Sequence, residues 1–197
     1  MLPEAELFSR HGYGILTLDT RPCLGLISTL GALESRDLAP MLNFAATQPG
    51  VNRVAGLGFS VGAVSLLMGA PQQPQLRSLI AEGNFPNLYS EFTAVPAPLF
   101  SFTWQVQRAS AASYWLLTGI PPWMVSPLDA LASLKDRQVL LIHGEKEAWR
   151  TKPEMQLAAS GSGARLWVVP GADHGEYYQA APLEYERRVI EFLEQSR

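Results

Sequence analysis

One serine in this chain lies between two glycines, directly after an apolar run and directly before a helical pattern. The segment reads Gly58-Phe59-Ser60-Val61-Gly62. Residues 53–57 are typical of a short buried strand, so the serine falls at a sharp, strained turn from strand to helix. We expect that a Cβ at Gly58 or Gly62 would collide with the neighbouring helix or strand. Such a turn would present the Ser60 hydroxyl outside the sheet, beside the backbone N–H of Val61 at the start of the helix.

Short apolar runs alternate with amphipathic stretches along the chain. The runs are residues 13–18, 53–57, 76–81, 138–143 and 165–169. Each is apolar on both faces and ends in turn residues, which is typical of strands buried in a parallel sheet. The alternation predicts an α/β fold with a mostly parallel sheet of about five strands, flanked by helices. The length of 197 residues indicates one domain, residues 1–197.

Residues 84–134 interrupt this alternation. They contain no clear strand, but they are rich in aromatic residues and prolines. An insertion of this length is unusual for a simple connection between two strands. We expect a helical cap over a functional site, which would provide an apolar pocket for an acyl or aromatic group. The alternative is that these aromatic side chains only pack against the sheet.

The composition limits the class of protein. A formal net charge of −3 gives no basic surface for nucleic acid. The single cysteine, Cys23, excludes an internal disulfide and a cysteine zinc site, and we expect neither a metal nor a cofactor. The N-terminal residues do not form a secretory signal, and no apolar run is long enough to span a membrane. We therefore expect a soluble, cytoplasmic protein.

The serine needs a basic partner if it is to act as a nucleophile, because a hydroxyl alone is weak at neutral pH. An ordinary strand-to-helix turn, in which Ser60 caps the helix, needs no such partner. Of the three histidines, His174 follows the run 165–169, and the carboxyl ends of parallel strands share one edge of a sheet. We therefore expect His174 beside Ser60. His11 is more typical of a helix end, and His143 of local packing at a strand end.

A histidine base also needs a carboxylate that fixes its tautomer and stabilises its charged form. The loop after the run 138–143 offers Glu145 and Glu147, and it leaves the sheet at the same edge. We choose Glu147, with Glu145 in reserve, because Glu147 has cleared the strand end and can turn toward His174. Asp173 is excluded because neighbouring side chains on an extended loop diverge. In the alternative interpretation, both glutamates are surface charges.

The order Ser60, Glu147, His174 resembles that of the α/β-hydrolase family, in which the serine lies in a nucleophile elbow. Residues 12–21 resemble the family's strand before the elbow strand, residues 142–147 its acid-bearing turn and residues 170–175 its histidine loop. The similarity extends over essentially the whole chain. It implies a serine hydrolase, most often an esterase, lipase, thioesterase or peptidase, with Val61 giving an oxyanion N–H and with no metal or cofactor.

Three features depart from that family. Glu147 stands where aspartate is more common, and Pro22 and the residues after it replace the usual glycine-rich turn. The chain also starts at what resembles the helix after the family's third strand. It therefore lacks a counterpart of the loop that normally provides the second oxyanion donor. Loss of one such donor can lower the rate by about two to three orders of magnitude.

Two hypotheses follow for the function. The first is a serine hydrolase acting on carboxylic esters or related acyl bonds, with a small-molecule acyl substrate. The second is a catalytically impaired or noncatalytic α/β-hydrolase-like domain that binds an apolar ligand or partner through its aromatic segment.

The missing third strand also predicts how the N-terminal part behaves. Without it, either residues 13–18 pair directly with 53–57 or the sheet keeps an open edge. An open edge predicts a homo-oligomer through the N-terminal edge or low stability of the single chain. Direct pairing would instead bring residues 20–25 near Ser60, where they would supply a substitute oxyanion N–H.

Overall fold

A four-stranded parallel sheet forms the centre of the molecule. The computed structural model describes residues 2–19 and 21–196. The strands lie in the order β1-β2-β3-β4, with bounds Val54–Phe59, Leu76–Glu82, Gln138–Gly144 and Ala164–Val169. All three pairings are parallel, so the four carboxyl ends meet at one edge of the sheet. The α/β fold class expected from the sequence is confirmed.

Ten α-helices and five short 3-10 helices are present in the described residues. The α-helices are α1 (Leu2–Arg10), α2 (Leu38–Ala46), α3 (Val61–Gly69), α4 (Leu88–Phe92), α5 (Phe102–Thr118), α6 (Pro127–Ala132), α7 (Ala148–Thr151), α8 (Pro153–Ala159), α9 (Tyr177–Ala180) and α10 (Pro182–Gln195). The 3-10 helices are η1 (Arg21–Leu24), η2 (Glu34–Asp37), η3 (Ala70–Gln72), η4 (Pro122–Met124) and η5 (Glu145–Glu147). No described helix is both long and apolar enough to cross a membrane.

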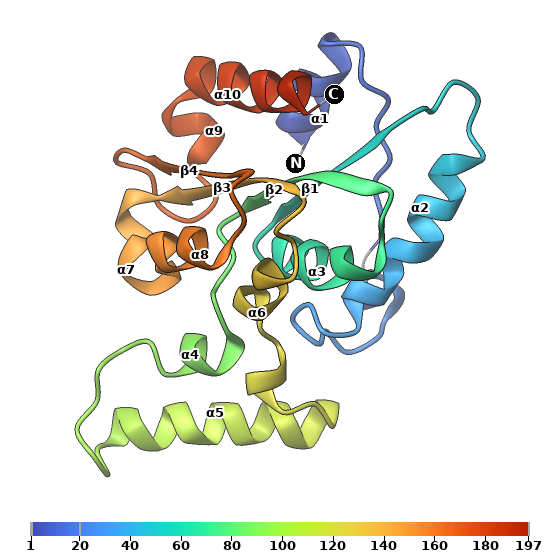
Figure 1. Ribbon diagram of the computed structural model, residues 1–197. Coiled ribbons are helices and arrows are strands. Elements are labelled where there is room, and N and C mark those ends of the chain that lie inside the picture. The colour runs from blue at the N-terminus through green and yellow to red at the C-terminus, as the bar shows by residue number, and fades with distance from the viewer. Residues whose placement is uncertain (1, 20, 197) are drawn as a thin grey trace.

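Helices cover both faces of the sheet (Figure 1). Strand side chains alternate between the faces, so Ile80 and Ile142 pack with α1, α9 and α10, whereas Leu79 and Leu141 pack with α2, α3 and α6. All four side chains are almost fully buried. Each contributes about 1.5–3 kcal/mol through burial, so the continuous apolar runs of the sequence stabilise both layers at once.

Residues 13–18 do not form the expected strand. The segment has no regular secondary structure and pairs with no strand of the described sheet, which therefore has four strands rather than about five. The N–H of Tyr13 donates to the carbonyl of Phe8, which ties the start of the segment to α1. From there it runs as coil toward the region of α2 (Figure 1), and Ile15 and Leu18 are 45% and 42% exposed. An apolar run becomes a strand only where a neighbouring strand can pair with it. Residues 13–18 do not pair with β1.

Residues 84–134 form helices and loops without a strand, and every one of them is described. Figure 1 shows α4 and α5 extending away from the sheet. The side chain of Ser101 caps the start of α5 by accepting from the N–H of Trp104, and Gly119, with a φ of 72°, ends the helix. Tyr114 anchors α5, because it is buried and its hydroxyl donates to the carbonyl of Thr29 at 2.8 Å.

Candidate active site

Ser60 lies on a strained turn between β1 and α3. Its φ of 52° and ψ of −119° are unusual for a residue with a side chain. A Cβ at Gly58 would lie 2.5 Å from the carbonyl oxygen of Gly62, so the expected collision at Gly58 is confirmed. The expected collision at Gly62 is wrong, because a Cβ there would meet no atom within 4 Å. Only Gly58 lies directly against the backbone of the first helical turn.

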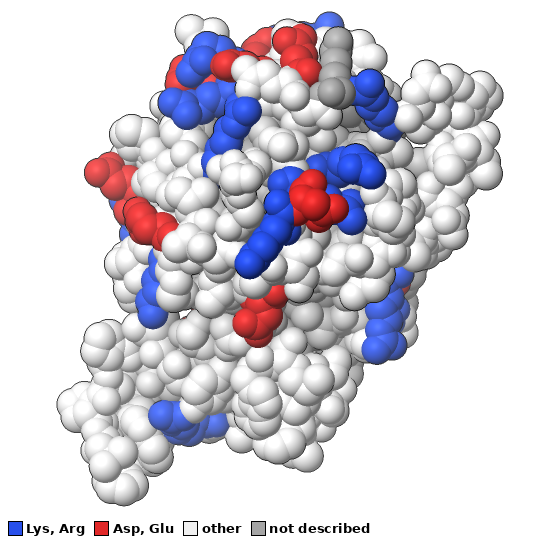
Figure 2. Space-filling model, viewed as in Figure 1, with Lys and Arg blue, Asp and Glu red and all other residues white. Residues whose placement is uncertain are grey.

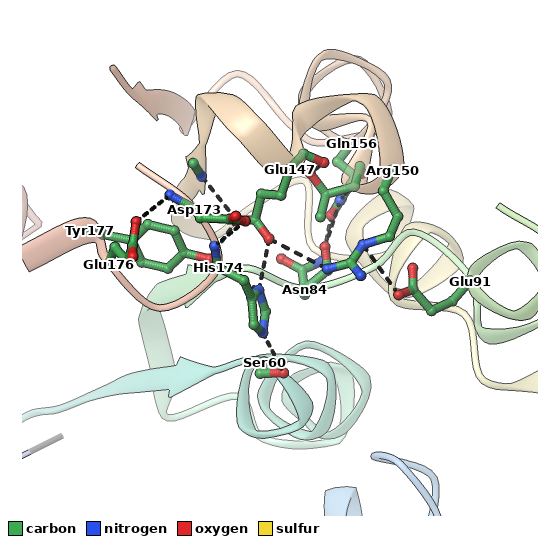
Figure 3. A network of polar contacts seen from close by, with 12 residues as sticks. Ser60, Asn84, Glu91, Glu147, Arg150, Gln156, Asp173, His174, Glu176 and Tyr177 are labelled. Atoms are coloured by element: carbon green, nitrogen blue, oxygen red, sulfur yellow. Dashed lines mark hydrogen bonds and ion pairs between the residues drawn. The ribbon is translucent and has the colours of Figure 1, made fainter. Parts of the chain in front are cut away.

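The structure brings Ser60, His174 and Glu147 together (Figure 3). His174 Nε2 lies 3.1 Å from Ser60 Oγ, and His174 Nδ1 lies 2.7 Å from Glu147 Oε2. The three residues follow β1, β4 and β3, whose carboxyl ends share one edge. The prediction that Glu147 reaches His174 is confirmed. Glu145 does not take this place, since its Oε2 accepts from the N–H of Gly171 at 2.7 Å.

The carboxylate of Glu147 is buried and held by several donors. Oε1 accepts from the N–H of Gly144 at 2.9 Å and from the hydroxyl of Tyr177 at 2.5 Å, while Oε2 faces His174. Burial raises the pKa of Glu147, but the hydrogen bonds from His174, Gly144 and Tyr177 outweigh it and bring the pKa to about 2. Glu147 is therefore ionised at neutral pH, although its side chain is only 2% exposed.

The loop that carries His174 is fixed by its own contacts. The ring of Phe59 packs against the imidazole, with 4.9 Å between ring centroids. The side chain of Asp173 accepts from the backbone N–H of His174 at 2.8 Å rather than from its ring. Gly83, with a φ of 63°, lets the end of β2 approach closely, because a Cβ there would lie 2.9 Å from His174 Cε1 and would overlap the hydroxyl of Tyr177.

Backbone hydrogen bonds continue past the strand ends into the loops of the site. The N–H of Ser60 donates to the carbonyl of Glu82 at 2.7 Å. One step across the sheet, the N–H of Gly83 donates to Ile142 at 2.9 Å, and the N–H of Lys146 then donates to Ala172 at 3.1 Å. These bonds join the residue after β1 to the end of β2, the residue after β2 to β3, and the turn after β3 to the loop after β4.

The other two histidines lie outside this arrangement. His11 follows α1, as expected for a residue at a helix end, and its Nε2 lies 2.8 Å from Glu186 on α10. His143 is fully buried at the end of β3, and neither ring nitrogen has a hydrogen-bond partner among the described residues. Burial lowers the pKa of His143 to about 4, so it is neutral at pH 7.

Val61 is the first residue of α3, and N–H groups in the first turn of a helix have no acceptor within the helix. The expected substitute donor from residues 20–25 depends on a strand at 13–18 beside β1, and that pairing is not present. Thr20 lies outside the described residues. Arg21 forms two hydrogen bonds of 3.1 Å with Asp37, and the side chains of Arg21 and Leu24 line a groove of about 420 Å³ against α2.

Sequence reasoning missed several polar residues that support the site. Tyr177 stands three residues after His174, and this proximity in the sequence is the one signal for its role. Asn84 and Gln156 are fully buried and bonded to one another at 2.5 Å. Arg150 lies 3.4 Å from Glu91 on α4 and 3.9 Å from Glu147.

No group of three or more His, Cys, Asp or Glu side chains suited to a metal ion exists within residues 2–19 and 21–196.

Comparisons with known proteins bear on the fold. No protein-family model and no curated protein sequence matches this chain. Among solved structures, the Pyrococcus furiosus esterase Pf2001 is 22% identical with a TM-score of 0.74, over 99% of this chain and 76% of the esterase. The alpha/beta hydrolase GrgF from Penicillium sp. sh18 is 15% identical with a TM-score of 0.72, over 100% and 84%. The esterase domain of a Rhodothermus marinus protein is 17% identical with a TM-score of 0.53, over 80% and 70%. The chain has the α/β-hydrolase fold.

Proposed function

We propose that this protein is a serine hydrolase that cleaves carboxylic esters or related acyl bonds. The observation that carries the proposal is the continuous line of contacts from Ser60 Oγ through His174 to Glu147, with distances of 3.1 and 2.7 Å. Along the chain the nucleophile Ser60 comes first, the acid Glu147 second and the base His174 last, which is the order known for α/β hydrolases. The esterases and hydrolase among the structural neighbours support the same class.

The proposed reaction begins with Ser60. Its Oγ attacks the acyl carbon while His174 Nε2 takes the hydroxyl proton, and the oxyanion that forms binds the N–H of Val61. The intermediate collapses as His174 gives that proton to the leaving alcohol. A water molecule then attacks the acyl-enzyme with His174 as base, and Ser60 regains a proton as the carboxylic acid leaves. Glu147 remains ionised and stabilises the imidazolium through Nδ1.

We further propose that residues 84–134 act as a cap within a single domain, residues 1–197. In support, Glu91 on α4 pairs with Arg150, which in turn lies 3.9 Å from Glu147, so the segment reaches the site. The segment carries three charged residues, Glu91, Arg108 and Asp129. Figure 2 shows few charges over α4 and α5. Such a cap suits an apolar acyl group.

A second candidate is a domain that binds an apolar partner without catalysis. It is favoured by the exposed apolar side chains on α5, where Phe102 and Leu116 are 82% and 87% exposed. This candidate predicts no turnover and no requirement for His174.

A fluorophosphonate probe and a short-chain p-nitrophenyl ester distinguish the two candidate functions. We expect the wild type to be labelled and to hydrolyse the ester, and Ser60→Ala and His174→Ala to lose at least about 10³-fold in rate. Ser65→Ala is the matched control, because that serine lies five residues further on in α3 and its hydroxyl donates to the carbonyl of Val61. Equal labelling of wild type and Ser60→Ala would exclude Ser60 as the nucleophile. Absence of turnover in the wild type would favour the binding domain.

A further inference from the structure

We propose that Tyr177 is a positioning residue, whose hydroxyl orients the carboxylate of Glu147 toward His174. The inference rests on the proposed function, in which Glu147 stabilises the charged histidine. Tyr177 itself touches no reacting atom. It would act only through the acid.

The placement of Tyr177 is tightly defined. It is the first residue of α9, directly after the loop that carries His174, and it is only 2% exposed. Its hydroxyl lies 2.5 Å from Glu147 Oε1 and 3.4 Å from His174 Nδ1 (Figure 3). Its ring packs in the core at 6.2 Å from that of Phe59. Gly83 also lies against the hydroxyl of Tyr177, because a Cβ at Gly83 would overlap that hydroxyl.

The arrangement explains how a glutamate serves where the family more often uses aspartate. Glutamate has one more rotatable bond, so its carboxylate needs more contacts to hold one orientation. Two donors, the N–H of Gly144 and the hydroxyl of Tyr177, share Oε1. Oε2 is thereby directed to His174 Nδ1. Removing the phenol would leave a single donor on Oε1 and free the carboxylate to rotate.

The two partners also fix each other's protonation state. Burial, and then the hydrogen bond to Glu147 and its negative charge, raise the pKa of Tyr177 far above the ordinary value, so the phenol stays a donor. In return, the phenol is among the hydrogen bonds that keep Glu147 ionised. The pair therefore has one arrangement at neutral pH, with the proton on the tyrosine.

A second buried tyrosine provides a matched control. Tyr185 is fully buried, and its hydroxyl lies 2.5 Å from the carboxylate of Glu82. The two tyrosine–glutamate pairs have the same hydrogen-bond length and similar burial of the phenol. They differ in charge, because Glu147 is ionised at neutral pH whereas the pKa of Glu82 is about 7. Only the Tyr177 pair is bonded to His174. Tyr185→Phe therefore measures the effect of removing a buried phenol hydroxyl that does not contact the His174–Glu147 pair.

The first test is a double-mutant cycle on ester hydrolysis with Tyr177→Phe and Glu147→Gln. We expect Tyr177→Phe to lower kcat about 10- to 100-fold with KM nearly unchanged, because misplacement of a group near the reaction lowers the rate that strongly. In the Glu147→Gln background, Tyr177→Phe should lower kcat by less than about twofold, since the carboxylate is already lost. Tyr185→Phe should have the same small effect in both backgrounds. Equal losses from Tyr177→Phe in both backgrounds, or none in the wild type, would overturn the proposal.

The second test does not depend on turnover. The low-field ¹H NMR resonance of the His174 Nδ1 proton reports its hydrogen bond to Glu147. We expect this resonance to shift or to disappear by exchange in Tyr177→Phe and to persist in Tyr185→Phe, with both variants checked for cooperative unfolding. An unchanged resonance in Tyr177→Phe would overturn the proposal. If the resonance depends on Tyr177 while the wild type neither hydrolyses esters nor reacts with the phosphonate, the proposed function fails and the positioning role stands.

Discussion

The two sides of β1 differ sharply. On the side of β2, the backbone pairs along the whole strand, and the loops beyond the strand ends hold Ser60, His174 and Glu147 together at 3.1 and 2.7 Å. On the other side, residues 13–19 and 21–27 form no strand and contain one short 3-10 helix, and several of their apolar side chains are exposed. The hydrogen bonds that join Ser60, His174 and Glu147, and those from Gly144 and Tyr177 to Glu147, come from residues after Val54. The contacts among Ser60, His174 and Glu147 are thus made by the segments that follow β1, β4 and β3.

The largest effect should come from the acid on the ordered side. Glu147→Gln keeps the shape of the side chain but removes the charge that stabilises the imidazolium, so we expect about a 10³- to 10⁴-fold loss of kcat for ester hydrolysis. Glu145→Gln, two residues earlier, should stay near the wild-type rate, because Glu145 bonds the backbone of Gly171. The measurement is steady-state hydrolysis of a p-nitrophenyl ester. The reverse ranking would transfer the role to Glu145.

The next largest effect should be on stability, when a methyl group is added to Gly58 before the turn after β1. Gly58→Ala places a Cβ 2.5 Å from the carbonyl oxygen of Gly62, so we expect a loss of about 3 kcal/mol in the free energy of unfolding. Gly62→Ala meets open space within α3 and should be neutral or stabilising by up to about 1 kcal/mol. Urea unfolding of both variants checks the pair. Similar losses at both positions would show that the two glycines are equally constrained.

A third prediction concerns Glu82, at the end of β2 on the face covered by α1 and α10. Burial, partly offset by the hydrogen bond from Tyr185, raises its pKa from 4.5 to about 7, with a further contribution from the charge of Glu4. Between pH 4.5 and 7 the unfolded state is ionised while the folded state holds the proton, so this group lowers stability as pH rises through that window. We expect Glu82→Gln to be more stable than the wild type by about 3 kcal/mol at pH 8, and equal to it near pH 4. The measurement is the free energy of unfolding of both proteins at pH 4 and pH 8. The same difference between Glu82→Gln and the wild type at both pH values would contradict the prediction.

The smallest effect on stability should come from the open side. Leu24 and Ile27 are 67% and 64% exposed, so Leu24→Lys with Ile27→Lys should change the free energy of unfolding by no more than about 0.5 kcal/mol each. If the chain associates through this edge, as we expect, light scattering should show the variant with a lower mass than the wild type. Leu183→Lys on α10, at an 83% exposed site, is the control. A wild type that is monomeric and unfolds cooperatively would exclude association through this edge.

Much of the fold followed from local patterns. The apolar runs at 53–57, 76–81, 138–143 and 165–169 became the four strands, of which β2 and β3 are almost wholly buried and β1 and β4 partly buried. Shared strand ends then placed His174 beside Ser60. Residues 13–18 carry a similar pattern without a partner ladder, and local pattern does not report a partner. The freedom at Gly62 and the contact of Tyr177 with Glu147 were also out of reach, since both depend on the path of the backbone in three dimensions.

The backbone bonds that continue past the strand ends have a consequence for motion. The amides of Ser60, Gly83 and Lys146 each donate to the next segment across the sheet, so the loops of the site are extensions of one ladder rather than independent connections. Opening one loop then requires breaking bonds of the sheet itself. Hydrogen exchange at these three amides should be slow and should respond together to denaturant, as within one cooperative unit, while the amides of exposed residues such as Ile15 and Leu16 exchange freely.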